Sequence, residues 1–321
     1  MSLPPAQPPW GLGTAFRLAV VVSAAAVGAP LMAWADERDL SVVSGEVTLK
    51  ARVVGSDGAG QTMVVLHGGP GLDESYLAAL TWLAAADRRI VFYDQRGAGG
   101  SSRPPSGDYG LPAQVGDLEA VRKAVGADRI HLVAHSWGTV VALAYTAAHP
   151  AAVASLILIG MGAPTAAADR RSFGARFGER KAALVRQGVV PAARPGARPD
   201  RDGDDCMPAF DAILPVHFAD ARHPGARHLA GSYHCEVGRL TSAAAGDWDF
   251  RKLLSSLGVP TLLVIGDADA NYAGARETAQ LIGPERLAWG ELRGCGHFPW
   301  IECPEPFFAT LIRFLSLTAG N

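Results

Sequence analysis

The stretch from residue 129 to residue 148 reads RIHLVAHSWGTVVALAYTAA, and this stretch decides the fold. Arg129 to Ala134 is rich in branched apolar residues, which predicts a buried strand. Gly138 to Ala148 contains mostly small and apolar residues and predicts a helix. Only His135, Ser136 and Trp137 separate the two predicted elements, so the chain must turn sharply there. A strand followed at once by a helix is the unit from which parallel α/β sheets are built.

Similar units flank this stretch on both sides. The sequence predicts an opening hairpin at 42–54, followed by strands at 62–66, 89–94, 155–159, 260–265 and 286–292. Predicted helices alternate with these strands at 73–86, 112–125, 273–282 and 304–317. Strands that are apolar at every position are typical of a sheet buried on both faces. The predicted fold class is therefore α/β, with a mostly parallel, doubly wound sheet.

The alternation stops near Gly162 and resumes at Pro260. Residues 163–250 are rich in Arg, Ala, Pro and His, and the part from 187 to 205 has the proline and glycine content of a loop. We therefore expect a core formed by residues 36–162 and 251–321. We expect residues 163–250 to be an inserted, mainly helical lid.

The composition excludes several classes of protein. Of the 321 residues, 49% are hydrophobic and 19% are charged, and the formal net charge is −2. A disordered chain would have few apolar residues and a large net charge. A nucleic-acid-binding surface would need an excess of Lys and Arg. We therefore expect a folded protein without a nucleic-acid partner.

Residues 1–35 are predicted to be a leader rather than part of the globule. Arg17 precedes an uncharged apolar run that ends in Ala33-Trp34-Ala35. A basic residue, a short apolar run and a small-x-small site are the features of a secretory signal peptide. We expect cleavage after Ala35 and export to the periplasm or the medium. The alternative is an uncleaved membrane anchor, because the run carries no charge, and only then would the chain contact a membrane.

The chain has four cysteines, Cys206, Cys235, Cys295 and Cys303. Cysteines of exported proteins meet oxidising conditions, in which they pair. Spacing favours Cys206 with Cys235 and Cys295 with Cys303, while the alternative is four buried thiols. No Cys-x-x-Cys motif is present, and the histidines of the insertion have no regular ligand spacing, so we expect no metal site.

Ser136 is the candidate nucleophile. It lies in Ala134-His-Ser-Trp-Gly138, which matches the G-x-S-x-G nucleophile elbow with alanine in place of the first glycine. A serine on a tight turn between strand and helix is held out of the sheet, and its neighbours must be small. The alternative role of Ser136 is to cap the following helix.

A serine hydroxyl needs a base and an acid that orients the base. His297 follows the last predicted strand in a glycine-containing loop, Gly294-Cys-Gly-His297. Asp269 follows the strand at 260–265, and Asp267 is its competitor two residues earlier. The order Ser136, Asp269, His297 is the chain order of α/β-hydrolases. Either aspartate could instead cap the helix that follows.

The oxyanion of an acyl-transfer intermediate needs two backbone N–H donors. The residue after the nucleophile supplies one of them, which is Trp137 here. The loop after the first parallel strand supplies the other, and this loop reads His67-Gly-Gly-Pro-Gly71. We expect Gly69 to be the second donor, because glycine allows the backbone to approach the substrate closely.

Three motifs together resemble the proline iminopeptidase family of α/β-hydrolases. They are the loop from His67 to Gly71, the run from Tyr93 to Gly97 that reads YDQRG, and Ser136-Trp-Gly138. The resemblance implies an aminopeptidase that releases N-terminal proline through an acyl-enzyme, with no cofactor. It also implies that Asp94 and Arg96 support the oxyanion loop from behind.

In this family, glutamates of the lid bind the free ammonium of the substrate. The resemblance therefore makes Glu236 the first candidate for this role and Glu179 the second, although either could be a solvated lid carboxylate. The alternative function is a carboxylesterase or another non-peptide hydrolase on the same core. A third possibility is a catalytically silent binding protein, against which the complete set of Ser136, Asp269 and His297 argues. In each enzymatic case the expected partner is a small molecule or a short peptide.

Overall fold

The computed structural model describes residues 36–58, 60–85, 87–192, 206–229 and 232–318. Within them the chain forms an eight-stranded sheet with the order β1-β2-β4-β3-β5-β6-β7-β8. The strands are β1 (Glu37–Ser44), β2 (Val47–Val54), β3 (Gln61–Leu66), β4 (Arg88–Tyr93), β5 (Ile130–His135), β6 (Val153–Ile159), β7 (Thr261–Gly266) and β8 (Leu287–Leu292). β1 and β2 form an antiparallel hairpin, β2 pairs with β4 in antiparallel fashion, and the six strands β3 to β8 are parallel. The predicted α/β fold is confirmed.

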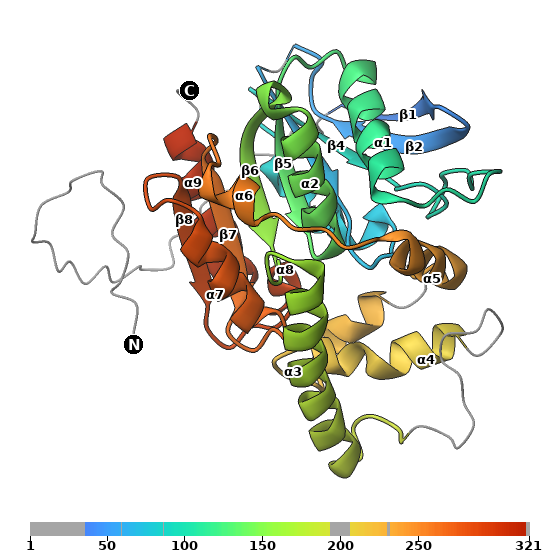
Figure 1. Cartoon of the computed structure of the whole chain (residues 1–321), viewed down its shortest axis with the longest axis vertical. Coiled ribbons are helices and arrows are strands. Elements are labelled where there is room, and N and C mark those ends of the chain that lie inside the picture. The colour runs from blue at the N-terminus through green and yellow to red at the C-terminus, as the bar shows by residue number, and fades with distance from the viewer. Residues whose placement is uncertain (1–35, 59, 86, 193–205, 230–231, 319–321) are drawn as a thin grey trace, which may run out of the picture.

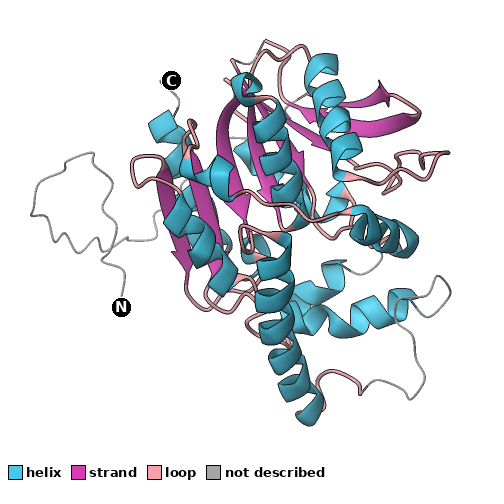
Figure 2. Cartoon of the chain, in the orientation of Figure 1, coloured by secondary structure: helices cyan, strands magenta, loops and turns pink. Residues whose placement is uncertain are grey.

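Helices cover both faces of the sheet (Figures 1 and 2). One face packs against α1 (Leu111–Ala124), α2 (Trp137–Ala148) and α7 (Tyr272–Leu281). The other face packs against η1 (Glu74–Leu83) and α9 (Pro304–Thr318). Neighbouring residues of β5 point to opposite faces, so that Leu132 joins the first core and Val133 the second. This double burial explains why the strands are apolar at successive positions.

The predicted elements agree closely with the structure. The helix expected over 73–86 is present as a 3₁₀ helix at residues 74–83, and the opening hairpin begins at Glu37 rather than at residue 42. Asp73 begins this helix, and its carboxylate accepts the N–H of Ser75 at 3.0 Å. Short connecting elements complete the core: η2 (Pro150–Ala152), α6 (Arg251–Ser255) and α8 (Pro299–Glu302).

The segment between β6 and α6 is helical where the structure describes it. It contains α3 (Ala166–Arg186), α4 (Cys206–Ile213), η3 (Leu214–His217), η4 (Pro224–Leu229) and α5 (Cys235–Ala244). In Figure 1 these helices lie together beyond one end of the sheet. The N–H of His234 donates to Gly71 O, and the N–H of His297 donates to His217 O. The segment therefore lies over the loops that follow β3 and β8. Most of the predicted loop at 187–205 falls outside the described residues.

Both disulfides favoured by spacing are present. Cys206–Cys235 joins the first residues of α4 and α5, and Cys295–Cys303 joins the loop after β8 to the start of α9. The four cysteines are therefore not free thiols.

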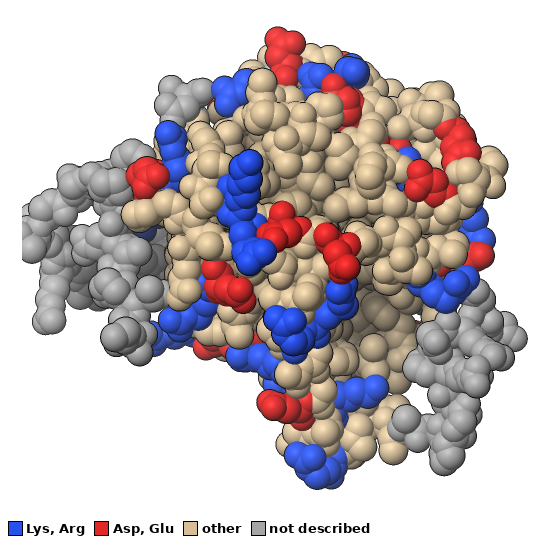
Figure 3. All heavy atoms as spheres, in the orientation of Figure 1, with Lys and Arg blue, Asp and Glu red and all other residues tan. Residues whose placement is uncertain are grey.

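Positive and negative side chains are interspersed on the face drawn in Figure 3, so no surface of one sign dominates that face. In the part of the chain that the structure describes, no helix combines the length and the apolarity needed to cross a membrane. The predicted leader, residues 1–35, lies outside this part.

Candidate active site

Ser136 occupies a strained turn between β5 and α2. Its backbone has φ 52° and ψ −118°, and it is the one non-glycine residue with positive φ among the described residues. Positive φ is unfavourable for a residue with a side chain and is found where the surrounding structure enforces it. The N–H of Ser136 donates to Ile159 O at 2.9 Å, which ties the turn to the end of β6. The turn has the geometry of a nucleophile elbow.

Asp269 and His297 form a buried pair at the same edge of the sheet. His297 Nδ1 lies 2.7 Å from Asp269 Oδ2, and both side chains are almost inaccessible to solvent. The other carboxylate oxygen, Oδ1, accepts the N–H of Asn271 at 2.9 Å. Because a carboxylate only accepts, Nδ1 carries the proton and Nε2 is left to act as a base. The structure thus places His297 and Asp269 as the sequence predicts.

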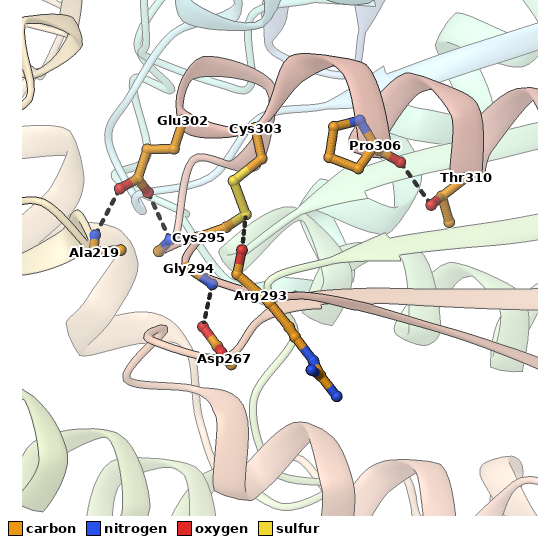
Figure 4. The surroundings of a disulfide bond; sticks show 10 residues. Ala219, Asp267, Arg293, Gly294, Cys295, Glu302, Cys303, Pro306 and Thr310 are labelled. Atoms are coloured by element: carbon orange, nitrogen blue, oxygen red, sulfur yellow. Dashed lines mark hydrogen bonds between the residues drawn. A yellow bond between two sulfur atoms is a disulfide. The ribbon is translucent and has the colours of Figure 1, made fainter. Parts of the chain in front are cut away.

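Asp267 has a different partner. Its Oδ1 accepts the N–H of Gly294 at 2.8 Å, which supports the turn that leads to His297 (Figure 4). Its backbone carbonyl accepts from Arg176 at 2.7 Å. Between the two aspartates considered from sequence, only Asp269 bonds to the imidazole.

Two glycines allow the backbone to pass close to these side chains. A Cβ at Gly68 would lie 2.9 Å from the Cβ of Ser136. A Cβ at Gly160 would lie 3.0 Å from His297 Nδ1 and 3.3 Å from Asp269 Oδ2. The loops after β3, β5, β6, β7 and β8 therefore converge on one point. Ser136 and His297 form no direct hydrogen bond in the described residues, a geometry often found in enzymes without substrate.

Within the described residues, the two predicted oxyanion donors form no hydrogen bond. Trp137 contributes the first N–H of α2, which has no carbonyl partner within the helix. Within the described residues, neither this N–H nor that of Gly69 donates a hydrogen bond. The N–H of Gly68, in contrast, donates to Tyr76 OH at 2.6 Å. Gly69 and Trp137 thus remain available to an incoming ligand.

The run from Tyr93 to Gly97 holds the loop after β3, but through a residue not anticipated from sequence. Gln95 Nε2 donates to His67 O at 2.6 Å, and the N–H of Gln95 donates to His67 Nε2 at 2.8 Å. Asp94 accepts the N–H groups of Glu74, at 3.0 Å, and of Gly100, at 2.8 Å.

Arg96 points away from that loop. Its guanidinium forms a buried ion pair with Asp117 of α1, at 2.7 Å, and also donates to two backbone carbonyls. Of the two residues expected behind the oxyanion loop, Asp94 therefore holds the chain that follows it, whereas Arg96 fixes α1.

The loop that carries His297 is fastened from several directions. The disulfide Cys295–Cys303 closes it, and the Glu302 carboxylate accepts the N–H of Gly296 at 2.6 Å (Figure 4). The other oxygen of Glu302 accepts the N–H of Ala219, also at 2.6 Å, so this carboxylate links the base loop to the helical segment. Burial raises the pKa of Glu302.

Histidine and aromatic rings cover His297 from the helical segment. The His217 ring centre lies 5.4 Å from that of His297 and 5.1 Å from that of Phe177 on α3. Burial lowers the pKa of His217 to about 3, so this ring is neutral at ordinary pH. The surface that the segment presents to His297 is therefore uncharged at this point.

The carboxylates considered for ammonium binding lie elsewhere. Glu236 forms an ion pair with Arg103, in which both side chains are exposed, and Glu179 is exposed on α3. Neither bonds to Ser136, Asp269 or His297 in the described residues.

Asp211 on α4 was not singled out from sequence, yet its Oδ1 is buried and has no hydrogen-bond partner in the described part of the chain. The available signal is its position, an acid between the apolar residues Phe210 and Ala212. α4 continues directly into η3, the element that ends at His217. Among the described residues no group of three or more His, Cys, Asp or Glu side chains is arranged to hold a metal ion.

Comparison with known proteins finds similarity to α/β hydrolases. The α/β-hydrolase-fold family model matches residues 61–187. A proline iminopeptidase from Lactobacillus helveticus is 27% identical over 82% of this chain and 92% of its own length.

Two solved structures share the fold over most of the chain. The proline iminopeptidase of Mycobacterium smegmatis superimposes with a TM-score of 0.69 at 21% identity, over 88% of this chain and 100% of its own. An esterase from Rhodococcus superimposes with a TM-score of 0.67 at 25% identity, over 87% and 98%. The chain has the α/β-hydrolase fold and is similar to proline iminopeptidases over about four fifths of its length.

Proposed function

We propose that this α/β hydrolase, which resembles the proline iminopeptidases, hydrolyses its substrate through an acyl-enzyme on Ser136. The observation that carries the proposal is the convergence of a strained serine turn and a buried His297–Asp269 pair at one edge of the sheet. Such a constellation activates a serine for attack on a carbonyl carbon.

Each residue of the site has a separate role in the proposed reaction. His297 Nε2 takes the proton of Ser136 as Oγ attacks the carbonyl carbon, and Asp269 stabilises the imidazolium that forms. The N–H groups of Gly69 and Trp137 bind the oxyanion. His297 then gives the proton to the leaving group, which departs. A water molecule, deprotonated by His297, then attacks the acyl carbon. The bond from this carbon to Ser136 Oγ breaks, and His297 returns the proton to Oγ. No metal or organic cofactor takes part in this scheme.

Replacement of Ser136 tests this mechanism. Ser136→Ala removes the only atom that forms the acyl-enzyme, so hydrolysis should fall by about 10⁶-fold, to the level left by binding and the oxyanion donors. Ser255→Ala, on the exposed helix α6, is the matched control and should retain full activity. Retention of more than a tenth of the activity by Ser136→Ala would reject the assignment.

For the substrate we propose a short peptide or amide with a free N-terminal proline. The similarity to proline iminopeptidases favours this substrate, and as the partner of its ammonium group we propose the unpaired carboxylate oxygen of Asp211. A buried carboxylate oxygen without a partner is unfavourable and would be stabilised by a substrate ammonium. The rival function, a carboxylesterase, is favoured by the uncharged rings over His297 and by the pairing of Glu236 with Arg103.

A chromogenic prolyl amide and a short acyl ester separate the two functions on one preparation. An aminopeptidase should lose about 2–5 kcal/mol in kcat/KM for the amide in Asp211→Asn, because the ammonium is left without its partner. The same variant should hydrolyse the ester normally. Glu236→Gln is the control, since its carboxylate already pairs with Arg103. If the unmodified protein hydrolyses the ester better than the amide, the aminopeptidase function is rejected and the esterase function is supported.

We also propose that residues 163–250 act as the lid of this site and that the chain is exported after cleavage behind Ala35. The contacts of the helical segment with the loops after β3 and β8 support the first proposal. The disulfides support the second, because such bonds persist in oxidising compartments.

A further inference from the structure

A buried chain of hydrogen bonds that the proposed mechanism does not use runs behind Ser136. The N–H of Gly68 lies 2.6 Å from Tyr76 OH, which lies 2.8 Å from His135 Nδ1. His135 Nε2 in turn lies 3.0 Å from the backbone carbonyl oxygen of His297. Tyr76 is 7% exposed and His135 is 1% exposed. The chain thus connects the loop of the oxyanion donors with the loop of the base.

The direction of each hydrogen bond follows from the groups at the two ends. A carbonyl oxygen only accepts, so His135 Nε2–H donates to His297 O. Nδ1 is then the unprotonated nitrogen and accepts from the hydroxyl of Tyr76. The Tyr76 oxygen accepts from Gly68 N–H. Every polar side-chain atom of this hydrogen-bond chain has a partner, and His135 is neutral because burial lowers its pKa well below the ordinary value.

Ring packing holds both side chains in this arrangement. The His135 ring centre lies 4.6 Å from that of His297 and 4.8 Å from that of Trp300. Trp300 Nε1 also donates to the backbone carbonyl of Tyr76 at 3.2 Å. An apolar residue at position 135 could fill this space, but it would leave His297 O and Tyr76 OH buried without partners, which is unfavourable.

We propose that His135 and Tyr76 are positioning residues that fix the Gly68–Gly69 loop and the backbone of His297 relative to Ser136. His135 immediately precedes Ser136, so a displacement of its ring moves the base loop relative to the nucleophile. The inference rests on the proposed function, in which Ser136 attacks and His297 is the base.

Variants at position 135 separate the two arms of the chain. In His135→Gln the amide nitrogen reaches the place of Nε2 and keeps the hydrogen bond to His297 O. In His135→Asn the shorter amide reaches only the place of Nδ1, so it keeps the Tyr76 arm and loses the base-loop arm. His135→Leu loses both arms. We expect kcat to fall about 10-fold in His135→Gln and about 100-fold in His135→Leu, about a factor of ten for each hydrogen bond. His135→Asn should fall below His135→Gln.

His131→Gln is the matched control. His131 is buried on the same strand, four residues before His135 and away from the site. It has its own hydrogen bond, in which Nδ1 lies 2.8 Å from Ser155 Oγ. A general loss of packing in β5 would affect both histidines. Turnover of the control should equal that of the unmodified protein.

The measurement is kcat and KM for a short acyl ester, with kcat expressed per serine titrated by a fluorophosphonate. A misplaced base lowers kcat and leaves KM nearly unchanged, whereas partial unfolding lowers only the number of titrated sites. Tyr76→Phe keeps the aromatic ring and removes only the hydroxyl, so it tests the chain even if His135→Leu does not fold. We expect its kcat per site to fall about 10-fold.

The outcomes separate this inference from the proposed function. If Ser136→Ala hydrolyses the ester, the proposed function fails and the inference fails with it. If Ser136→Ala is inactive but His135→Leu and Tyr76→Phe turn over like His131→Gln per titrated site, only the positioning role is overturned. His135→Asn above His135→Gln would overturn the assignment of the base-loop arm.

Discussion

At the scale of single residues, Gly160 is the position where the smallest addition should disturb the site most. Its φ is +62°, and an added Cβ would lie 3.0 Å from His297 Cε1 and Nδ1. Gly160→Ala should therefore displace the imidazole and reduce kcat/KM for an ester by about 10-fold or more. For comparison, a displacement of a reacting group by about 1 Å can lower the rate by about 10²-fold.

Gly174→Ala on α3 is the control for that change. No atom lies within 4 Å of its added Cβ, and alanine favours a helix by about 0.5–1 kcal/mol over glycine. We expect a slightly higher Tm and unchanged activity. Equal activity in Gly160→Ala and Gly174→Ala would contradict the close packing inferred at the His297–Asp269 pair.

The two aspartates after β7 should behave differently when each is replaced by asparagine. Asp269→Asn places an amide against His297 Nδ1 and favours the wrong tautomer, so kcat should fall by about 10⁴-fold. Asp267→Asn keeps a carbonyl oxygen that can accept from Gly294 N–H, so we expect little change. Steady-state measurement of kcat for both variants on one ester tests which aspartate orients His297. A larger loss in Asp267→Asn would show that the acid was chosen wrongly.

Which site residues are predictable depends on the range of their contacts. Ser136, Asp269 and His297 each follow a recognisable strand, so local sequence and chain order were sufficient to find them. The roles of Tyr76 and His135 depend on contacts between residues 59 and 162 positions apart. Gln95 likewise reaches 28 residues back to His67. No local pattern marks such partners, because the sheet order brings them together.

At the scale of elements, the buried strands were predicted to within about two residues because they are apolar without interruption. The helix expected at 73–86 is present over residues 74–83, but its 3₁₀ type was not predicted, since composition does not distinguish a 3₁₀ from an α-helix. The arrangement of α3, α4 and α5 could not be predicted. α3 has few buried residues, and its position depends on contacts such as Arg180 with the carbonyl of Val216, 36 residues away.

Acid should weaken the contact between α1 and α2. The Glu119 carboxylate accepts from Arg122 Nε and from Tyr145 OH, each at 2.8 Å. The hydrogen bond from Arg122 lowers the pKa of Glu119 to about 2. A pKa that is lower in the folded state stabilises the fold above the unfolded value of 4.5, and this contribution is lost as pH falls from about 4.5 to about 2.

Glu119→Gln should therefore unfold at a lower temperature than the unmodified protein at pH 7. The difference should shrink as the pH falls toward 2, where about half of the Glu119 side chains in the folded protein are protonated. Thermal unfolding followed by circular dichroism between pH 2 and 7 measures this difference in Tm. Glu285→Gln, at an exposed position, is the control. A gap in Tm that does not change with pH would disprove the electrostatic origin.

The two disulfides should differ in what their removal affects. By chain entropy, opening the Cys206–Cys235 bridge, with its separation of 29 residues, lowers the free energy of unfolding by about 3.5 kcal/mol. Opening Cys295–Cys303, with a separation of 8, lowers it by about 2.5 kcal/mol. His297 lies two residues after Cys295, however, so loss of the shorter bridge should reduce turnover more.

Double Cys→Ser variants of each bridge test whether the two bridges rank differently in stability and in turnover. Stability is measured by denaturant unfolding, and turnover as kcat per titrated serine. The unfolding experiment should rank Cys206–Cys235 as the more important bond, and the kinetic experiment should rank Cys295–Cys303 first. The same rank in both experiments would mean that the shorter bridge does not hold the base loop in place.

At the scale of the whole molecule, the site depends on both halves of the core. Ser136 and the oxyanion loop come from the strands before the helical segment, and Asp269 and His297 come from the strands after it. The central contact is that of β6 with β7, four register pairs from Leu156–Thr261 to Ile159–Val264. The helical segment is thus accommodated between two strands that remain neighbours in the sheet.

The last prediction concerns the mature chain and its compartment. The described structure begins at Asp36, and β1 begins one residue later. Cleavage after Ala35 would therefore leave all eight strands intact.

Material recovered outside the cytoplasm should begin at Asp36 and should show no free thiol when denatured without reductant, since both bridges form there. The chain from Asp36 made in a reducing cytoplasm should show four thiols, a lower Tm and a lower turnover. N-terminal sequencing and thiol counting on both preparations measure this. A membrane-bound product that retains residues 1–35 would instead establish the anchor.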